Sequence, residues 1–423
     1  MRSQLLFIVV ILVTGCSRQE PFTIPVRDKL SSKALPEDGL EVGQFQSSLK
    51  ELVEIDKARL LKTVNSRTPC MESVRVPMDF PTIQDALDHV CPGGDIIVSA
   101  GEYFEDVIAL TPGVHIKGRG NVYLNGGFVV YADDIMIQNF TIDAGLHSAP
   151  YVIGIGIGPV TGGLITHNTV LYSGDETVGI GIVLSQSTGQ IIQGNNISGT
   201  ASWGMAVNLC NDIMIKNNDI AVTGSPHPPE NEAVTQVQGM RLFSCSNVVI
   251  RNNEITGGQW GIYFFSIPVT PPCNHNTISN NRITGISYAS VIGLQGDCDY
   301  NVINGNDLTD NPGIFNAGIM LYSRPVSYPT GFCDNNIVKN NVSSRNYAGV
   351  WINRGGTNNT VGPNNTLDDN QEYGFYISGS ATGNTIFNNH MVNNTTCDIG
   401  NYADDPSANT LSHNTYDCCE NCQ

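Results

Sequence analysis

The sequence predicts an all-β protein, a right-handed parallel β-helix solenoid of about ten coils with a short N-terminal helical cap. Two phrases that recur down the chain and a composition rich in turn formers support this prediction. Only 14% of the residues are charged, whereas 44 are glycine. This composition is typical of a β-rich fold with many turns and argues against a helical one.

The first phrase is a pair of asparagines followed closely by an aliphatic residue. With the second asparagine as a marker, Asn341, Asn365, Asn389 and Asn414 are separated by 24, 24 and 25 residues. A longer gap, such as the 35 residues from Asn218 to Asn253, equals the same period plus a loop. A fixed period of this length predicts a stack of similar coils.

The second phrase precedes each marker and begins with glycine, after which residue types alternate. Alternation with one apolar set predicts short, half-buried strands. A unit of two or three such strands cannot bury its apolar residues alone, but stacked copies form a continuous aliphatic core. The asparagines at the turns are expected to form hydrogen-bonded ladders between coils. The phrase occurs as Gly179-Ile180-Gly181-Ile182, Gly204-Met205-Ala206-Val207, Gly239-Met240-Arg241-Leu242, Gly261-Ile262-Tyr263-Phe264, Gly318-Ile319-Met320-Leu321, Gly349-Val350-Trp351-Ile352 and Gly374-Phe375-Tyr376-Ile377.

Residues 1–15 are predicted to be a lipoprotein signal peptide. Arg2 precedes an apolar run, Leu5–Val13, that is too short to span a bilayer. Val13-Thr14-Gly15-Cys16 resembles the bacterial lipobox, and the resemblance implies that Cys16 is lipidated. Ser17, rather than an aspartate, follows the cysteine. This resembles the sorting pattern of lipoproteins that are sent to the outer membrane. We therefore expect a protein of the bacterial cell envelope that is attached to the membrane by its lipid anchor.

The rest of the chain divides into three parts. Residues 16–75 are expected to be a tether and a short helix, because Leu52, Ile55, Leu60, Leu61 and Val64 follow near-helical spacing. Residues 76–416 are expected to form the β-helix. Residues 417–423 are a cysteine-rich C-terminal tail.

Three stretches at the front of the β-helix resemble the opening of pectin-lyase-like proteins. They are Phe80–Asp88, Pro92–Val98 and Gly101–Ile108. The resemblance implies that a short helix caps the solenoid and that Gly101-Glu102-Tyr103-Phe104-Glu105 lies in the first coil. The superfamily includes lyases, esterases, hydrolases, epimerases and proteins without known chemistry, so the resemblance implies a fold and not an activity.

The active-site signatures of three families with this fold are missing from the sequence. These are the signatures of pectin methylesterases, polygalacturonases and mannuronan epimerases. Similar repeats occur in NosD-type periplasmic proteins and in carbohydrate-binding and sugar-hydrolysis domains. The cluster of Met and His that a NosD-type factor would need on one face is not seen.

Residues between the core positions of the second phrase are expected to point outward and form a stripe along the solenoid. Rings in such a stripe can stack on sugar faces, while Arg, Asn and Gln donate hydrogen bonds to hydroxyls. The alternative is that the aromatic residues only pack neighbouring coils together. The stripe comprises Asn208, Arg241, Phe243, Tyr263, Phe265, Gln295, Met320, Tyr322, Trp351, Asn353, Tyr376 and Ser378.

The longest insertion, Thr223–Glu232, lies just before the strand that carries Arg241. Large loops on repeat scaffolds often hold binding residues. In a polysaccharide lyase an arginine would pair with the uronate carboxylate, and a Tyr, His or Arg would take the adjacent proton. The candidate catalytic residues are His227, Glu230, Glu232, Arg241 and Tyr263; the alternative is a surface loop with ordinary solvated charges.

The net charge of −18 disfavours nucleic acid as a partner. It also disfavours tight binding of a polyanionic sugar unless calcium ions bridge the negative charges. Calcium is therefore the one possible cofactor, and the sequence assigns no metal-binding residues. The same acidity could serve solubility alone.

Twelve cysteines in an exported chain predict disulfides, and removing Cys16 leaves an odd number. Five of them occupy similar positions in successive coils: Cys210, Cys245, Cys273, Cys298 and Cys333. Stacked positions lie within disulfide reach, so adjacent pairs such as Cys210–Cys245 and Cys298–Cys333 are expected, although the register is ambiguous. Cys70 and Cys91 are expected to staple the cap, and Cys397, Cys418, Cys419 and Cys422 to lock the last coil. A metal site at Cys418–Cys422 is the weaker alternative.

Two functions fit these observations. The first is a surface-anchored lipoprotein that binds polysaccharide or oligosaccharide and, if it is an enzyme, acts as a lyase, epimerase or glycoside hydrolase. The second is a non-catalytic structural or adhesive cell-surface solenoid.

Overall fold

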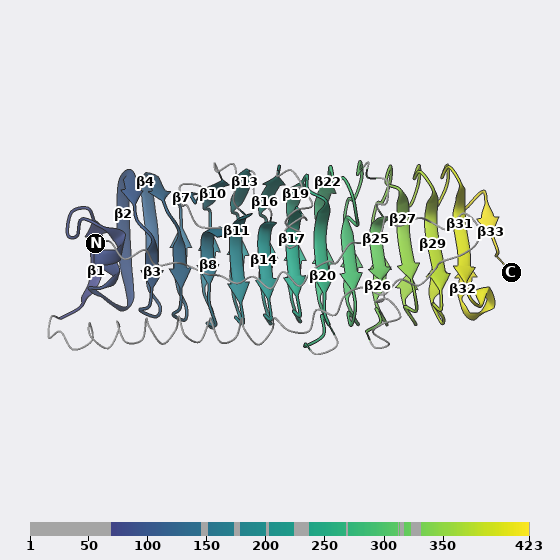
Figure 1. Ribbon diagram of the computed structural model, residues 1–423, viewed down its shortest axis with the longest axis horizontal. Helices are drawn as coiled ribbons and strands as arrows, with labels where there is room; N and C mark the ends of the chain where they lie inside the picture. Colours follow the sequence, from purple (N-terminus) through teal and green to yellow (C-terminus); the bar gives the residue numbers. More distant parts are fainter. Residues whose placement is uncertain are drawn as a thin grey trace.

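The computed structural model describes residues 69–144, 151–172, 178–199, 203–223, 237–267, 270–311, 313, 317–322 and 331–422. These residues form one elongated solenoid whose strands run across its long axis (Figure 1). The signal peptide, Cys16, the tether and the predicted helix at residues 51–64 lie outside the described residues. So do His227, Glu230 and Glu232.

The strands of the described residues form two parallel sheets. The 20-stranded sheet contains two strands of most coils, namely β1 (Met71–Val76), β2 (Val90–Phe104), β4 (His115–Asn125), β6 (Met136–Gln138), β7 (Thr141–Asp143), β9 (Leu164–Thr166), β10 (Thr169–Tyr172), β12 (Ile191–Gln193), β13 (Asn196–Gly199), β15 (Met214–Lys216), β16 (Asp219–Val222), β18 (Val249–Arg251), β19 (Glu254–Thr256), β21 (Thr277–Ser279), β22 (Arg282–Thr284), β24 (Val302–Asn304), β26 (Ile337–Lys339), β28 (Thr360–Val361), β30 (Thr385–Phe387) and β32 (Thr410–Ser412).

The 13-stranded sheet contributes one strand to each coil. Its strands are β3 (Val107–Ala109), β5 (Phe128–Val130), β8 (Tyr151–Ile157), β11 (Val178–Ser185), β14 (Trp203–Asn208), β17 (Gln238–Phe243), β20 (Trp260–Phe265), β23 (Ile292–Gln295), β25 (Ala317–Tyr322), β27 (Ala348–Asn353), β29 (Tyr373–Gly379), β31 (Cys397–Ala403) and β33 (Cys419–Glu420).

The predicted all-β parallel solenoid is confirmed, but it has more than the ten coils expected. Strands β3, β5 and β8 precede the first Asn-Asn marker, Asn195-Asn196, so the repeat count missed their coils. The strands also extend beyond the expected range, from Met71 to Glu420. Strand β33 pairs with β31, which places part of the cysteine-rich tail in the last coil.

A short helix, α2 (Ile83–Leu87), lies at the N-terminal end of the solenoid (Figure 1). The hydroxyl of Thr82 accepts a hydrogen bond from the Asp85 amide at 3.0 Å and caps the helix. The Glu105 carboxylate accepts from the Ile83 and Gln84 amides at 2.8 and 2.9 Å. Glu105 thus joins the turn after β2 to the helix. The helix itself lies at the N-terminal end of the solenoid, as the pectin-lyase-like resemblance implies.

Aliphatic side chains stack in the interior, one above another, because the strands pair in register. One such column belongs to the 20-stranded sheet and is fully buried. A buried aliphatic side chain contributes roughly 1.5–3 kcal/mol relative to an exposed one. The column comprises Ile192, Ile215, Ile250, Ile278, Ile303, Val338, Val361 and Ile386.

Buried asparagines form ladders between coils, as the sequence predicts. At Asn281, the side-chain oxygen accepts from the backbone and side-chain amides of Asn253 at 3.0 and 2.9 Å. Its side-chain amide donates to the Ile250 carbonyl and to Asn306 Oδ1, both at 3.0 Å. The longest ladder repeats this contact through Asn168, Asn195, Asn218, Asn253, Asn281, Asn306, Asn341, Asn365, Asn389 and Asn414.

The two asparagines of each marker have different tasks. In the markers after Asn195-Asn196, the second asparagine is the ladder residue, whereas the first adopts a left-handed backbone conformation, with φ of 54° at Asn252 and 52° at Asn280. In Asn195-Asn196 the first asparagine is the ladder residue, and Gly194 before it has the positive φ. Asparagine tolerates this conformation better than most residues. The Asn-Asn phrase therefore combines a sharp turn with a buried amide in consecutive positions.

The five cysteines of successive coils are free thiols, so the expected pairs Cys210–Cys245 and Cys298–Cys333 are wrong. Their side chains point into the core, where each donates to a backbone carbonyl; Cys245 Sγ contacts the Phe243 oxygen at 3.2 Å. Burial raises the pKa of the Cys245 and Cys298 thiols well above its ordinary value. Buried, protonated thiols of this kind are inert.

The predicted disulfides at the two ends of the solenoid are confirmed. Cys70 is bonded to Cys91 beside the cap. In the last coil Cys397 is bonded to Cys418, and Cys419 to Cys422. Cross-links at both ends oppose fraying of the terminal coils, which have a neighbour on one side only.

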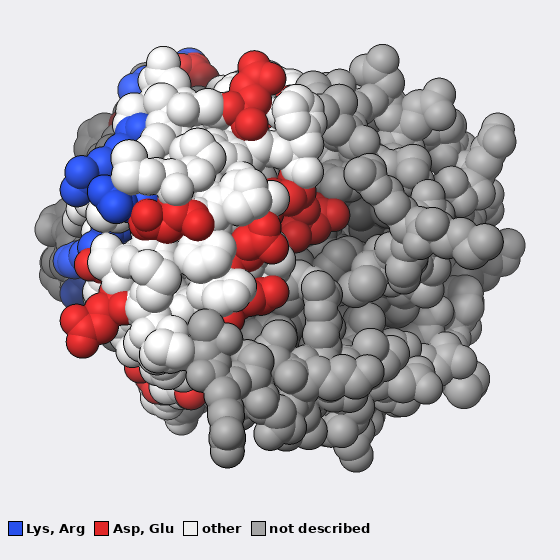
Figure 2. Space-filling model, turned by 90° about the vertical axis from the view of Figure 1, so that its left-hand side faces the viewer, with Lys and Arg blue, Asp and Glu red and all other residues white. Residues whose placement is uncertain are grey.

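Charged groups lie at the N-terminal end, where Figure 2 shows acidic side chains across the middle and basic ones gathered along one edge. Lys117 Nζ lies 2.8 Å from the Asp95 carboxylate, and Arg75 pairs with Asp79 at 3.2 Å. Exposed pairs of this kind add little stability. No helix in the described part of the chain is long and apolar enough to cross a membrane.

Aspartates also take part in a row of turn hydrogen bonds. The Asp299 amide donates to Asn274 Oδ1, and Asp299 Oδ1 accepts from the Asp334 amide, both at 2.7 Å. Burial, with the nearby Asp297 and Asp334 charges, raises the pKa of Asp299 to about 7. The folded protein therefore holds a proton here that the unfolded chain releases near its ordinary pKa of 3.8.

We predict that Asn281→Ala destabilises the protein by about 3 kcal/mol or more, because the Ile250 carbonyl and the Asn253 amide lose their buried partner. Equilibrium unfolding in urea measures the change. The exposed Asn196, changed to Ala, is the matched control and should shift stability by less than about 0.5 kcal/mol. Equal effects of the two substitutions would contradict the role of the ladder.

We also predict that the parent protein loses stability as the pH rises from about 4 to 7 and that the Asp299→Asn variant does not lose this contribution. Since the folded pKa is raised, stability from the protonated carboxyl is present below the unfolded pKa and is lost as the pH approaches 7. The variant should melt above the parent at pH 8 and not at pH 4. Exposed Asp219, changed to Asn, should show no such pH-dependent gain.

Candidate functional site

The outward residues of the 13-stranded sheet form three parallel rows along the solenoid. The register pairs Arg241 with Tyr263 and Phe243 with Phe265 in neighbouring coils. The structure thus brings every residue of the predicted stripe onto one face. The middle row runs through Val183, Ala206, Arg241, Tyr263, Gly293, Met320, Trp351 and Tyr376, and the second row through Ser185, Asn208, Phe243, Phe265, Gln295, Tyr322, Asn353 and Ser378.

Sequence reasoning missed the third row. It contains Trp203, Trp260 and Tyr373, each of which stands directly before the glycine of the second phrase. Because side chains alternate along a strand, that position shares a face with the two predicted rows. Extending the alternation one step towards the N-terminus would have found it.

The rows group into three apolar clusters on this face. The first contains Ile180, Val183, Trp203 and Ala206. In the second, Tyr263 stacks on Phe265 at 5.2 Å between ring centres and contacts Trp260 at 4.2 Å. In the third, Trp351 meets Tyr376 edge to face at 5.3 Å. Such aromatic pairs stabilise neighbouring coils beyond their buried area.

Arg241 links the first cluster to the second. Its guanidinium lies 4.7 Å from the centre of the Trp203 ring and 4.6 Å from that of Phe265. Its Nη1 donates to Asn208 Oδ1 at 3.4 Å, and the residue is only 5% exposed. Two cation–π contacts therefore hold the guanidinium in place.

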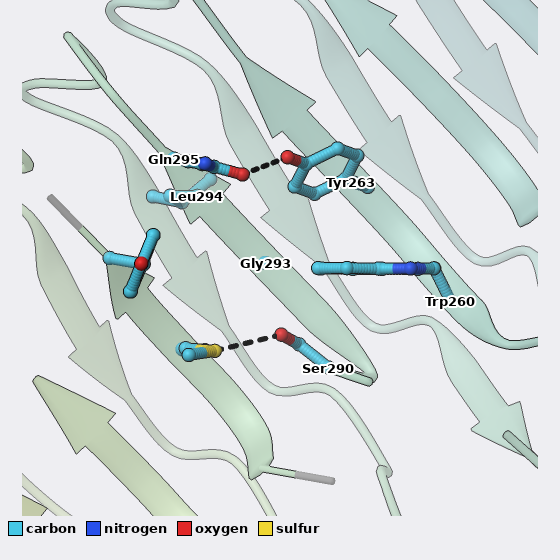
Figure 3. A pocket seen from close by; sticks show the side chains of 8 residues that line it. Trp260, Tyr263, Ser290, Gly293, Leu294 and Gln295 are labelled. Atoms are coloured by element: carbon cyan, nitrogen blue, oxygen red, sulfur yellow. Dashed lines mark hydrogen bonds between the residues drawn. The ribbon is translucent and has the colours of Figure 1, made fainter. Parts of the chain in front are cut away.

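A depression separates the second cluster from the third. The middle row has Gly293 here, between Tyr263 and Met320, so no side chain fills the gap. The cavity volume of the depression is about 10 Å³, close to the space that one water molecule needs. Tyr263 donates its hydroxyl hydrogen bond to Gln295 at one edge, and Ser290 contacts Met320 Sδ at 3.2 Å at the other (Figure 3). It is lined by Trp260, Tyr263, Ser290, Gly293, Leu294, Gln295, Met320 and Tyr322.

Most stripe side chains point outward but are buried, which corrects the expectation that they face solvent. Trp351 is 5% exposed and Tyr376 is 3% exposed. Asn208, Phe265, Tyr322 and Asn353 are also buried, whereas Gln295 is half-buried. Contacts between rings of neighbouring coils account for part of this burial. The stripe therefore does join neighbouring coils, which was the alternative role.

Of the candidate catalytic residues, the structure brings Arg241 and Tyr263 together in adjacent coils. Strands β11, β14, β17, β20, β23, β25, β27 and β29 contain no Asp or Glu. Among the described residues, no group of three His, Cys, Asp or Glu side chains is arranged to hold a metal ion. The face thus offers rings, amides, hydroxyls and a guanidinium, a set that suits binding better than two-carboxylate hydrolysis.

A family model described as a right handed beta helix region matches residues 113–266 and 230–395. The chain belongs to this family. The match agrees with the resemblance to the pectin-lyase-like superfamily and, like the fold itself, does not decide an activity. No curated protein matches the chain significantly.

Several solved structures share the fold of this β-helix protein. The periplasmic alginate epimerase AlgG has 14% identity and a TM-score of 0.56, over 82% of this chain and 84% of that one. A GH87 alpha-1,3-glucanase catalytic domain in complex with nigerose has 15% identity and a TM-score of 0.57, over 83% and 70%. The catalytic unit of a thermostable GH87 alpha-1,3-glucanase from Streptomyces thermodiastaticus has 16% identity and a TM-score of 0.51, over 79% of this chain and 66% of that one.

Proposed function

We propose that this β-helix protein binds a neutral or mildly acidic polysaccharide along the outer face of its 13-stranded sheet. The observation that carries the proposal is the depression at Gly293, where two aromatic clusters meet across a gap edged by Gln295. Rings on both sides can stack on the apolar faces of sugar rings, and the Gln295 amide can bond a hydroxyl.

The linear form of the site favours a polymer over a small sugar. The rows repeat once per coil, about every 4.8 Å, and the aromatic clusters follow one another along the solenoid. Successive sugar units can therefore meet similar groups in successive coils. This is the property that makes repeat scaffolds suitable for extended ligands.

Two structural relatives support carbohydrate as the ligand class. One is described as an alginate epimerase and another as a glucanase in complex with nigerose. Since their identity with this chain is near 15%, they support the fold as a carbohydrate-handling scaffold and no particular sugar.

The charge of the chain narrows the ligand class further. A net charge of −18 opposes a highly anionic polymer, so we favour a neutral or mildly acidic one. A uronate would need Arg241 or a bridging calcium ion. A lyase reaction would also require His227, Glu230 or Glu232 to approach Arg241 and Tyr263.

The proposal includes attachment to the bacterial cell envelope through lipidated Cys16, with the outer membrane as the expected location. Residues 17–68 would then join the anchor to the solenoid. The competing function is a structural or adhesive surface solenoid, which is favoured by the burial of the stripe. A glycan array probed with the purified protein separates the two.

We predict that Trp351→Ala weakens polysaccharide binding about tenfold and more than Arg241→Ala does, because Trp351 offers the largest ring in the two predicted rows. Isothermal titration with a glycan chosen from the array measures both. Phe104→Ala, an exposed aromatic residue of the 20-stranded sheet, should bind like the parent. A larger loss with Arg241→Ala would indicate a uronate, and parental binding by both variants would exclude this face.

We further predict that Gly293→Leu abolishes binding, because the new side chain fills the depression. A Cβ at this position lies 3.2 Å from Ser290 Oγ and the Trp260 ring, so the larger side chain must extend into the gap. Gly156→Leu is the matched control in the same row at a remote coil, where a Cβ meets nothing closer than 3.7 Å. Unchanged binding by Gly293→Leu would show that the depression is not a sugar site.

A further inference from the structure

Arg354 directly follows strand β27 and lies at the edge of the outward rows. Its Nη1 donates to the Tyr322 hydroxyl at 3.4 Å, and its guanidinium lies 5.9 Å from the centre of the Tyr322 ring. Tyr322 belongs to the third aromatic cluster and also lines the depression at Gly293. A cation therefore stands where the third cluster meets the depression.

The Arg354 guanidinium has no carboxylate partner among the described residues. Arg75, Arg282 and Arg345, in contrast, each form an ion pair with an aspartate or glutamate. A guanidinium has five N–H donors in a planar fork, which fits a carboxylate with two parallel hydrogen bonds. Because Tyr322 accepts one of these bonds, the other donors of Arg354 remain for a ligand.

Arg354 is also better placed than Arg241 to meet a charged ligand. Among the described Lys and Arg residues, these two alone lie in a strand of the 13-stranded sheet or directly after one. The Arg241 guanidinium contacts the rings of Trp203 and Phe265 and donates to Asn208, so described side chains already engage it. Arg354 is half-buried and has a single ring contact.

The backbone at Arg354 is left-handed, with φ of 55°. Most non-glycine residues of this protein in that conformation are Asn or Asp, which tolerate it, and the next coil has Gly379 at the equivalent position. Arg345 shares the conformation, but its side chain is engaged by Asp310. Residues held in this conformation cluster at ligand-binding sites, so the backbone agrees with a binding role for Arg354.

The size of the depression limits what can enter it. A volume of about 10 Å³ suits a single hydroxyl group or a water molecule, so a sugar ring would lie across the depression and not inside it. Gln295, Tyr322 and Asn353 occupy consecutive coils of the second row, about 4.8 Å apart, and Arg354 follows Asn353. A sugar unit over Gln295 and Tyr322 can therefore present a substituent to Arg354.

Aspartates on nearby turns limit how much negative charge the ligand can carry. Asp297 and Asp299 follow strand β23, and Asp334 accepts from the Thr357 amide at 2.7 Å, three residues beyond Arg354. In a chain with a net charge of −18, one guanidinium can offset one carboxylate of a ligand. A polymer with a carboxylate on every unit would also meet these aspartates and be repelled.

We propose that Arg354 binds the carboxylate of an acidic sugar unit, so that the ligand of this face is a polysaccharide with isolated carboxylates among neutral sugars. The inference rests on the proposed function and deepens it by naming the ligand class. Arg354, and not Arg241, then makes the charged contact through its two-pronged fork. Rings of the third cluster contact the neutral units on either side.

A matched pair of glycans tests the inference. The first is the tightest-binding acidic glycan of an array probed with the purified full chain, and the second is the same glycan with its carboxylates reduced to primary alcohols. In isothermal titration the parent should bind the acidic form about tenfold more tightly than the reduced form, because only the acidic form accepts the charged fork. Arg354→Gln should bind both forms alike, and Arg354→Lys should show an intermediate preference.

Arg345→Gln is the matched control. It removes the same charge from the same residue type at the same φ of 55°, but Arg345 lies before β27 and Arg354 after it. This control should keep the parental preference for the acidic glycan. An equal loss of preference in Arg345→Gln and Arg354→Gln would assign the effect to overall charge and overturn the inference.

A second variant guards against misfolding. Arg354→Gly suits the left-handed backbone, as Gly379 does in the next coil, and should lose the preference for the acidic glycan just as Arg354→Gln does. Retained preference in a folded Arg354→Gly variant, with melting like that of the parent, would overturn the inference.

The parent alone separates this inference from the proposed function. Equal affinity for the acidic and reduced glycans, or selection of neutral or fully charged glycans only, would overturn the role of Arg354 while polysaccharide binding stood. Failure to bind any glycan would overturn the proposed function, and the inference with it.

Discussion

Each coil of this solenoid is held to the next by asparagine side chains that lie inside the turns and form hydrogen bonds to the neighbouring coils. A backbone turn leaves amide and carbonyl groups that would be costly to bury without partners. The asparagine side-chain amide supplies a donor and an acceptor at the spacing of the strands: Asn281 donates to the Ile250 carbonyl and accepts from the Asn253 amide. The aliphatic core, the register of both sheets and the alignment of the outward rows all depend on this contact.

Because the ladders keep successive coils in register, outward residues at equal positions in different coils form straight rows. Short aromatic clusters can then assemble from residues far apart in the sequence, such as Met320 and Tyr373. A missing side chain at one coil, as at Gly293, becomes a depression with defined edges. The candidate site is therefore a property of the repeat, modified at one coil.

The outward groups of this face are mostly buried. The face has rings, amides and a guanidinium held by two rings, and its strands β11 to β29 contain no carboxylate. The same rings that could stack on sugars stabilise the contacts between coils. Burial of these rows sets this face apart from the outer face of the other sheet, and it makes access to the face the central question of function.

The sequence by itself determined the architecture, because a period near 24 residues and strict alternation permit little besides a stacked parallel solenoid. It also determined two of the outward rows, since strand alternation is a local property, while the cap was expected from the resemblance of Phe80–Asp88 to the pectin-lyase-like opening. The prediction missed the early coils because they have no Asn-Asn marker. It also missed the row of Trp203 and Trp260 because these residues stand just before the glycine with which the second phrase begins. Only the tertiary structure decided that the core cysteines are free, since that depends on which carbonyls surround each thiol. Burial of the stripe was likewise decided there, because exposure depends on what packs above a face and no local pattern contains that information.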